Sequence, residues 1–236
     1  MLDPPDIAHG EAYLHAGETM SETVPVVEIF KSIQGEGPMA GYPCAFVRTA
    51  GCNLNCSYCD TRFACEAEGR AMSLGEIVDE VEKLGCSNVC VTGGEPLIHK
   101  YVTLLCGELI AKRPCTVILE TNGTQDIGCI SSRVMTVMDI KCPGSGECGK
   151  TLWKNLKELS GGDVVKFVIG DREDFEWAAR CVEERRSLWM TPVYFAPVWD
   201  KLAGSELAEW ILDAGLTVRL QLQLQKILWP DKSRGV

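Results

Sequence analysis

The chain contains the segment Cys52-Asn53-Leu54-Asn55-Cys56-Ser57-Tyr58-Cys59, in which three cysteines follow one another with the spacing Cys-x3-Cys-x2-Cys. Three thiolates from one short loop can bind three iron atoms of a cubane iron–sulfur cluster, for which the usual protein count is four. No fourth cysteine follows at a matching spacing. One iron atom would then be open to a small molecule, as the open coordination position is in catalytic zinc sites. The spacing therefore predicts a catalytic cluster.

Two other interpretations of these cysteines stay open at this point. The same loop could bind a zinc ion with one distant ligand, for which Cys44 and Cys65 are the candidates. The thiols could also be buried apolar residues without a ligand, because the chain has 13 cysteines and some three-cysteine pattern can arise by chance.

Composition limits the class of protein. The 236 residues suffice for one large domain or two small ones. The net charge of −10 argues against a nucleic-acid partner, which normally requires a basic face, but leaves room for a small anionic substrate. No run of about 18 apolar residues is present, so no membrane partner is expected. The first residues do not form a signal peptide, and we expect a cytoplasmic protein with reduced thiols.

The pattern along the chain indicates one domain after a leader. Residues 1–24 are polar and lack a sustained period, which predicts a flexible leader, and residues 25–236 follow without a linker. Apolar runs predict strands at 26–30, 44–48, 88–92, 115–119, 134–140, 164–169, 192–196 and 216–222. Helical spacing predicts helices at 73–84, 99–112, 152–159, 174–186 and 205–214, the first opened by a capping box of Ser73 and Glu76.

Strands that alternate with helices, and that are apolar almost throughout, indicate a parallel sheet covered by helices. A complete barrel of eight strands and eight helices usually needs about 250 residues. We therefore predict an α/β fold with a partial, TIM-like β/α barrel. Ligands in such sheets bind at the carboxyl-terminal ends of the strands.

Glycine-rich and polar segments occur at those strand ends. Val91-Thr92-Gly93-Gly94-Glu95-Pro96 combines glycines, which allow close approach of a ligand, with free N–H groups that can bind a carboxylate. Glu120-Thr121-Asn122-Gly123-Thr124 and Asp139-Ile140-Lys141-Cys142-Pro143-Gly144-Ser145-Gly146 end two further strands. Each segment taken alone is also explained as a tight turn or a solvated loop.

The three-cysteine loop together with Gly-Gly-Glu-Pro resembles the radical S-adenosylmethionine (SAM) superfamily. The resemblance implies a [4Fe–4S] cluster whose open iron binds the amino acid part of SAM. It also implies reductive cleavage of SAM to a 5′-deoxyadenosyl radical that abstracts a hydrogen atom.

The segment from Ser32 to Gly37, Ser-Ile-Gln-Gly-Glu-Gly, and the stretch Cys59-Asp60-Thr61 narrow the resemblance to the 7-carboxy-7-deazaguanine synthase family. The likeness runs from about Val26 to the end of the chain. The tail resembles the family too, but Gln225 stands where histidine is usual. The resemblance implies conversion of 6-carboxy-5,6,7,8-tetrahydropterin to 7-carboxy-7-deazaguanine with release of ammonia, in queuosine and deazapurine biosynthesis.

The resemblance implies a role for each matching position. The cluster would be bound by Cys52, Cys56 and Cys59, and Mg²⁺ by Thr61. SAM would contact Tyr58, Cys59, Asp60, Gly94, Lys141, Cys142, Pro143, Gly144 and Ser145. The pterin substrate would contact Ile33, Gln34, Gly35, Arg48, Thr92 and Val236. No side chain is expected to do the chemical step itself, because the adenosyl radical does it.

The resemblance also implies an electron-donating reductase such as flavodoxin and a homodimer. Two rival functions stay open on the sequence alone. One is an activase that places a glycyl radical on a partner protein, which would share the cysteine spacing. The other is a zinc-stabilised interaction protein. We further predict that the C-terminal segment closes over the substrate.

Overall fold

The computed structural model describes residues 22–112, 114–185 and 191–236. The expected leader therefore lies outside the described residues, apart from its last three residues, of which Thr23 and Val24 belong to the first strand. The strands are β1 (Thr23–Ile33), β2 (Pro43–Thr49), β3 (Arg70–Ser73), β4 (Asn88–Gly93), β5 (Thr116–Thr121), β6 (Val134–Lys141), β7 (Val164–Ile169), β8 (Val193–Pro197) and β9 (Arg219–Leu220).

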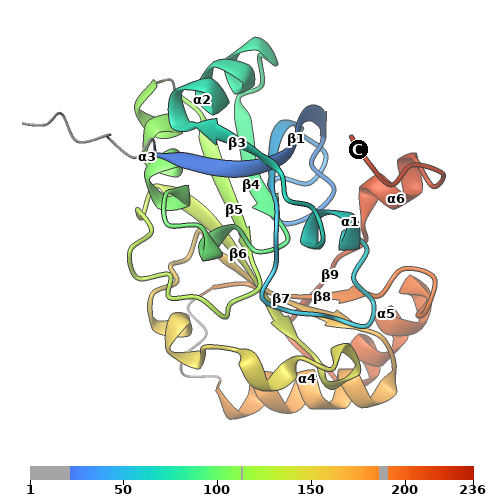
Figure 1. The fold of residues 1–236 in the computed structure, drawn as a ribbon. Helices are drawn as coiled ribbons and strands as arrows, with labels where there is room; N and C mark the ends of the chain where they lie inside the picture. Colours follow the sequence, from blue (N-terminus) through green and yellow to red (C-terminus); the bar gives the residue numbers. More distant parts are fainter. Residues whose placement is uncertain (1–21, 113, 186–190) are drawn as a thin grey trace, which may run out of the picture.

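The described strands form one open, curved sheet in the order β3-β1-β2-β4-β5-β6-β7-β8-β9 (Figure 1). All neighbours from β2 to β9 pair in parallel, whereas β1 pairs antiparallel with both β2 and β3. The order ends at β3 on one side and at β9 on the other, so the barrel is incomplete, and the predicted partial barrel is confirmed. The pairing of β1 and β3 adds an antiparallel edge that the parallel prediction lacked.

The α-helices in the described ranges are α1 (Arg62–Cys65), α2 (Leu74–Lys83), α3 (Val102–Lys112), α4 (Arg172–Glu184), α5 (Gly204–Asp213) and α6 (Leu224–Leu228). The capping box of Ser73 and Glu76 is present at the start of α2. Residue 186, the last of the expected helix 174–186, lies outside the described residues. None of the described helices is long and apolar enough to cross a membrane.

Two of the expected elements differ in the structure. The helix expected at 152–159 is a 3-10 helix over Trp153–Lys157. Its Asn155 side chain donates to the backbone oxygens of Gly123 and Gln125 at 3.2 and 2.7 Å, which ties the segment to a neighbouring loop in place of a regular helix. The strand expected at 216–222 is reduced to Arg219–Leu220 at the edge of the sheet.

Apolar side chains pack on both faces of the sheet. On the outer face, α2 and α3 cover the first half of the sheet and α4 and α5 cover the second half (Figure 1). On the inner face, a smaller apolar cluster forms a floor beneath the open end of the barrel. This floor consists of Cys44, Phe46, Cys90, Ile118, Val137, Val164 and Tyr194.

Two adjacent leucines of α3 provide a test of how the outer layer stabilises the fold. Leu105 is fully buried in the core, whereas the side chain of Leu104 is 50% exposed. Leu105→Ala is expected to lower the free energy of unfolding by about 2–5 kcal/mol, because it leaves a cavity among packed side chains. Leu104→Ala, the matched control, should change it by less than about 1 kcal/mol. Equal effects in urea unfolding would show that α3 does not pack as described.

Candidate functional site

The inner face of the sheet changes from apolar to polar along five neighbouring strands. On β5, for example, Ile118 belongs to the floor and Glu120 follows two residues later, so both side chains point to the same face. The corresponding pairs are Phe46 and Arg48 on β2, Cys90 and Thr92 on β4, Val137 and Asp139 on β6, and Val164 and Lys166 on β7. The polar members of all five pairs therefore lie on the carboxyl-terminal side of the apolar floor.

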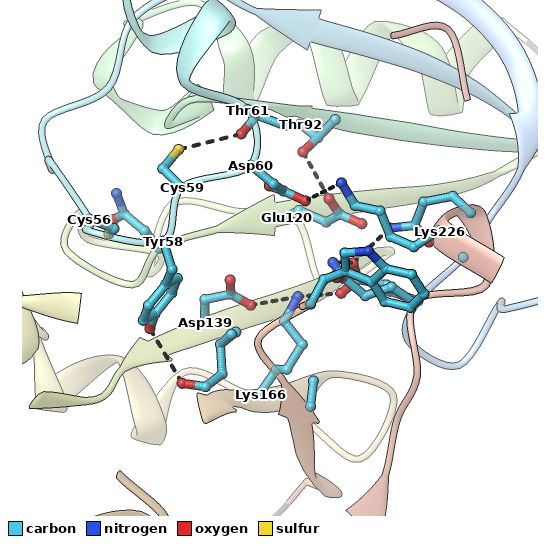
Figure 2. A pocket seen from close by; sticks show the side chains of 18 of the residues that line it. Cys56, Tyr58, Cys59, Asp60, Thr61, Thr92, Glu120, Asp139, Lys166 and Lys226 are labelled. Carbon is cyan, nitrogen blue, oxygen red and sulfur yellow. Dashed lines mark hydrogen bonds and ion pairs between the residues drawn. The ribbon is translucent and has the colours of Figure 1, made fainter. Parts of the chain in front are cut away.

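A cavity of about 510 Å³ lies above this floor. It brings together residues from the cysteine loop, the strand ends and the C-terminal segment (Figure 2). Of the residues predicted for the site, the following line it: Ile33, Gln34, Gly35, Arg48, Cys52, Cys56, Tyr58, Cys59, Asp60, Thr61, Thr92, Gly94, Lys141 and Val236.

The cysteine loop is held in place by hydrogen bonds to the ends of β5 and β6. The Ser57 hydroxyl donates to the Gly144 oxygen at 2.7 Å, and the Ser57 N–H donates to the Ser145 oxygen at 3.0 Å. From the β5 side, the Asn122 amide donates to the Asn53 side-chain oxygen at 3.0 Å. The position of the three thiols is therefore set by the sheet and not by the loop alone.

The donor set fits the iron–sulfur cluster that the spacing predicts. Cys52, Cys56 and Cys59 all line the cavity, and the Leu54 N–H donates to the Cys52 sulfur at 3.4 Å. Burial raises the pKa of the Cys56 thiol, a cost that iron coordination removes because the metal replaces the proton. No three metal-ligating side chains among the described residues converge on one ion. A cubane places its thiolates on separate iron atoms, so its ligands stand farther apart.

Cys65, left open above as a distant zinc ligand, also lines the cavity. Its sulfur lies 3.8 Å from the sulfur of Cys59. Burial, together with the neighbouring Cys59 and Cys52, raises the pKa of the Cys65 thiol to about 12. The other candidate, Cys44, is fully buried in the apolar floor and does not reach the site.

Gly94 is required by close packing at the loop after β4. A Cβ atom there would stand 2.1 Å from the Gly51 oxygen, so only glycine allows the two loops to touch. The next residue, Glu95, is fully buried and accepts hydrogen bonds from the Leu97 N–H at 3.0 Å and from the Thr121 hydroxyl at 2.9 Å. Glu95 therefore joins the ends of β4 and β5, and the Gly-Gly-Glu-Pro segment has a structural role next to the cysteine loop.

The segment predicted to line the SAM site divides into two parts. Lys141 lines the cavity, and its ammonium lies 2.8 Å from Asp139. Burial alone would lower the pKa of Lys141, but Asp139 raises it above the ordinary value. By contrast, Cys142, Pro143, Gly144 and Ser145 do not line the cavity in the structure. They lie behind the cysteine loop, with Cys142 in the outer apolar core.

Asp60 and Thr61 present oxygens from the end of the cysteine loop (Figure 2). Thr61 precedes α1 in the N-cap position, yet its side chain makes no capping hydrogen bond. Its hydroxyl lies 3.8 Å from the Cys59 sulfur. The carboxylate of Asp60 is 3.4 Å from the ammonium of Lys226 in the C-terminal segment. The Thr61 hydroxyl thus remains available for a hard cation.

Glu120 is the centre of the polar wall opposite the thiols. One of its carboxylate oxygens accepts from the Thr92 hydroxyl at 2.8 Å, and the other accepts from the Gln34 amide at 3.3 Å. Burial raises the pKa of Glu120 above its ordinary value. Glu120 appears in a motif of the sequence, but its place beside Gln34 and Thr92 becomes visible only in the fold.

Arg48 lines the cavity as predicted, and its side chain also contacts three neighbouring residues. Its Nε donates to Glu28 at 2.8 Å, and its guanidinium lies 5.7 and 5.8 Å from the ring centres of Phe30 and Phe63. These contacts orient a planar cation toward the cavity, where it can bind a carboxylate.

Sequence reasoning missed a buried charge cluster. The ammonium of Lys166 lies 2.6 Å from Glu36 and 3.0 Å from Asp139. Burial alone would raise the pKa of Glu36, but Lys166 holds it below the ordinary value, and Lys141 and Lys166 do the same for Asp139. The available signal was a lysine in the middle of the apolar strand Val-Val-Lys-Phe-Val-Ile, because such a residue must find a partner when buried.

The C-terminal segment is bound to the same cluster. Side-chain amides of Gln221, Gln223 and Gln225 donate to Glu36 at 3.1, 2.8 and 3.1 Å. Gln225, which replaces the usual histidine, therefore has a hydrogen-bonding role. The segment continues past α6 to Val236, which lines the cavity.

Comparisons with known proteins agree with this geometry. Residues 46–130 match the family model of the Radical SAM superfamily. A 7-carboxy-7-deazaguanine synthase of Chlorobaculum tepidum is 40% identical over 223 residues, covering 92% of this chain and all of that relative. One of Koribacter versatilis is 36% identical over 225 residues, covering 89% of this chain and 99% of the relative. The crystal structure of QueE from Escherichia coli shares the fold with a TM-score of 0.70 at 23% identity, over 85% of this chain and 94% of that chain.

The fold and the three-cysteine loop thus define a radical SAM enzyme, a class that holds a [4Fe–4S] cluster and SAM. The chain belongs to the 7-carboxy-7-deazaguanine synthase family. Inert thiols and a zinc-stabilised interaction protein are thereby excluded as interpretations of the loop.

Glu120→Gln is expected to stabilise the ligand-free protein at neutral pH. The pKa of Glu120 is raised in the folded state, so its ionised form opposes folding, and wild-type stability falls as the pH rises through the carboxyl range toward the folded pKa. The glutamine of the variant does not ionise, so the variant does not lose this stability. The difference in free energy of unfolding between variant and wild type, measured in urea, should therefore grow from acid to neutral pH. A constant or shrinking advantage would contradict the assignment, and the exposed Glu158→Gln controls for the loss of one charge.

Proposed function

We propose that this enzyme converts 6-carboxy-5,6,7,8-tetrahydropterin to 7-carboxy-7-deazaguanine with release of ammonia, in queuosine and deazapurine biosynthesis. The observation that carries the proposal is one cavity with three thiols on one wall and a hydrogen-bonding wall around Glu120 on the other. The relatives named 7-carboxy-7-deazaguanine synthase support it over nearly the whole chain.

The polar wall matches the chemistry of a pterin ring. Glu120 offers acceptors for ring and amino N–H groups, and Gln34 offers both a donor and an acceptor to an amide-bearing heterocycle. The ring would lie above the apolar floor, between Ile33, Gly35 and Thr92. Arg48 would bind the substrate carboxylate with guanidinium nitrogens other than Nε, which donates to Glu28. A cation and an anion at separate places fix the orientation of the substrate in the cavity.

Orientation is the main task of this chain. The cluster and SAM together supply a carbon radical, which reacts with almost any nearby C–H bond. The residues must therefore present one substrate hydrogen and exclude other partners. Tyr58, Asp60, Gly94 and Lys141 would hold SAM on the thiol side of the cavity, while the polar wall holds the pterin. Contact between SAM and the Cys142–Ser145 segment remains a prediction, because those four residues do not line the cavity.

Glu120 and Thr61 would assist in two further ways. Burial raises the pKa of Glu120, which makes this carboxyl group the candidate for proton exchange with the substrate during loss of ammonia. The Thr61 hydroxyl, which makes no capping bond, would bind Mg²⁺ together with oxygens of the substrate and water. Reductive activation would be supplied by a reductase such as flavodoxin, and we propose that the cytoplasmic enzyme acts as a homodimer.

A turnover assay tests the proposed function. Reconstituted protein with SAM, reductant and carboxytetrahydropterin should form 7-carboxy-7-deazaguanine and ammonia. Cys52→Ala should abolish both this product and 5′-deoxyadenosine, because the cluster loses one of its three ligands. The control Cys129→Ala, at an exposed position, should retain both. Intact cluster and SAM cleavage without deazaguanine would refute the assigned substrate while leaving the radical SAM chemistry standing.

The closing role of the C-terminal segment has its own test. Val236 lines the cavity, and Arg234 stacks on Phe63 with 4.3 Å between guanidinium and ring centre. Deletion of residues 234–236 is expected to lower kcat/KM by at least about tenfold, which corresponds to about 1.4 kcal/mol of lost transition-state binding. Iron content should stay unchanged, since no cluster ligand is touched. Unaltered kinetics would show that the end of the chain does not cover the substrate.

A further inference from the structure

A fourth thiol stands beside the cysteine loop. Cys65 lies at the end of α1, lines the cavity, and places its sulfur 3.8 Å from the sulfur of Cys59.

The position of Cys65 is fixed by the backbone. The N–H groups of Ala64 and Cys65 donate to the Thr61 oxygen at 2.8 and 3.4 Å, and the Gly51 N–H donates to the Ala64 oxygen at 2.8 Å. Arg62, on the same helix, donates to the Cys56 oxygen at 3.1 Å. The short helix is thus tied to Gly51, just before the cysteine loop, and to Cys56 within it, which fixes the backbone of Cys65 beside Cys59.

The distance favours a hydrogen bond over a fourth iron ligand. Thiolates of a cubane bind different iron atoms at its corners, so two sulfurs that touch at 3.8 Å do not suit two corners. The separation does suit an S–H group that donates to a neighbouring thiolate. Hydrogen bonds to the sulfurs are among the features that set the reduction potential of iron–sulfur clusters.

The other ligands differ in their donors. The Cys52 sulfur accepts from the Leu54 N–H at 3.4 Å and from the Asn122 amide at 3.8 Å. Among the described residues, the Cys59 sulfur takes part in two hydrogen bonds, one with the Cys65 thiol and one with the Thr61 hydroxyl, each at 3.8 Å. Because Thr61 is the proposed Mg²⁺ ligand, Cys65 is the thiol donor that remains for Cys59, and its thiol also interacts with Cys52.

We propose that Cys65 is a positioning residue whose thiol donates a hydrogen bond to the cluster-ligating sulfur of Cys59 and thereby raises the reduction potential of the cluster. The bond stabilises the reduced cluster, which carries one more negative charge, more than the oxidised cluster. This inference rests on a cluster at residues 52, 56 and 59 and not on the identity of the substrate.

The test is a redox titration of the reconstituted, SAM-free protein, followed by electron paramagnetic resonance of the reduced cluster. Cys65→Ala is expected to shift the midpoint potential to a more negative value, up to about tenfold in the reduction equilibrium, which is about 59 mV for one electron. Cys65→Ser, which keeps a hydrogen-bond donor, should have a midpoint potential close to that of the wild type. The control Cys129→Ala, exposed and outside the cavity, should match the wild type.

Two results would overturn the proposal. One is an unchanged midpoint potential in Cys65→Ala, or in Cys65→Val if the alanine variant binds less iron. The other is a Mössbauer spectrum in which all four iron atoms of the SAM-free cluster have a thiolate ligand, and in which one iron atom loses that ligand in Cys65→Ala. Cys65 would then be a ligand of the cluster. Neither measurement uses the pterin, so a wrong substrate would leave this result unaffected.

Discussion

The ammonium of Lys166, buried between the carboxylates of Glu36 and Asp139, is the interaction on which the site depends. A charge removed from water is strongly destabilising unless a partner is present, so each of these three side chains requires the others. Glu36 follows β1, Asp139 is on β6 and Lys166 is on β7. Their pairing therefore holds segments that are far apart in the chain against one another at the mouth of the barrel.

The same pairing fixes the C-terminal segment. Glu36 accepts from Lys166 with one carboxylate oxygen and receives the amides of three glutamines from residues 221–225. This arrangement satisfies a largely buried carboxylate almost completely. It also places α6 at the cavity, which Lys226 of this helix lines (Figure 2). The C-terminal segment thus lies along the cavity because its glutamines help to neutralise Glu36.

The site combines two walls with different chemistry. The cysteine loop presents soft sulfur ligands, and the strand ends opposite present carboxylates, amides and a guanidinium. The floor between them is apolar. A cofactor that generates a radical and a polar heterocycle can then be held side by side.

Much of the fold was accessible from local pattern. The parallel strands from 44–48 to 192–196 and the helices at 73–84 and 205–214 were predicted within a few residues, because their apolar periods are regular. The segment 152–159 was not, because Asn155 bonds to a loop that is distant in sequence. The edge strand β3 also escaped detection, since its four residues form a strand only by pairing with β1.

By itself the sequence determined which three cysteines form the thiol wall, because three cysteines on one short loop need no long-range contact to be recognised. It also determined the class of fold, through alternating strands and helices. Only the tertiary structure decided which polar residues face the thiols and that Cys65 touches Cys59. The physical reason is that burial and charge pairing join residues across the sheet, namely 36, 120, 139, 166 and 221–225. These residues are far apart in the sequence, so no local stretch of the chain shows that they meet.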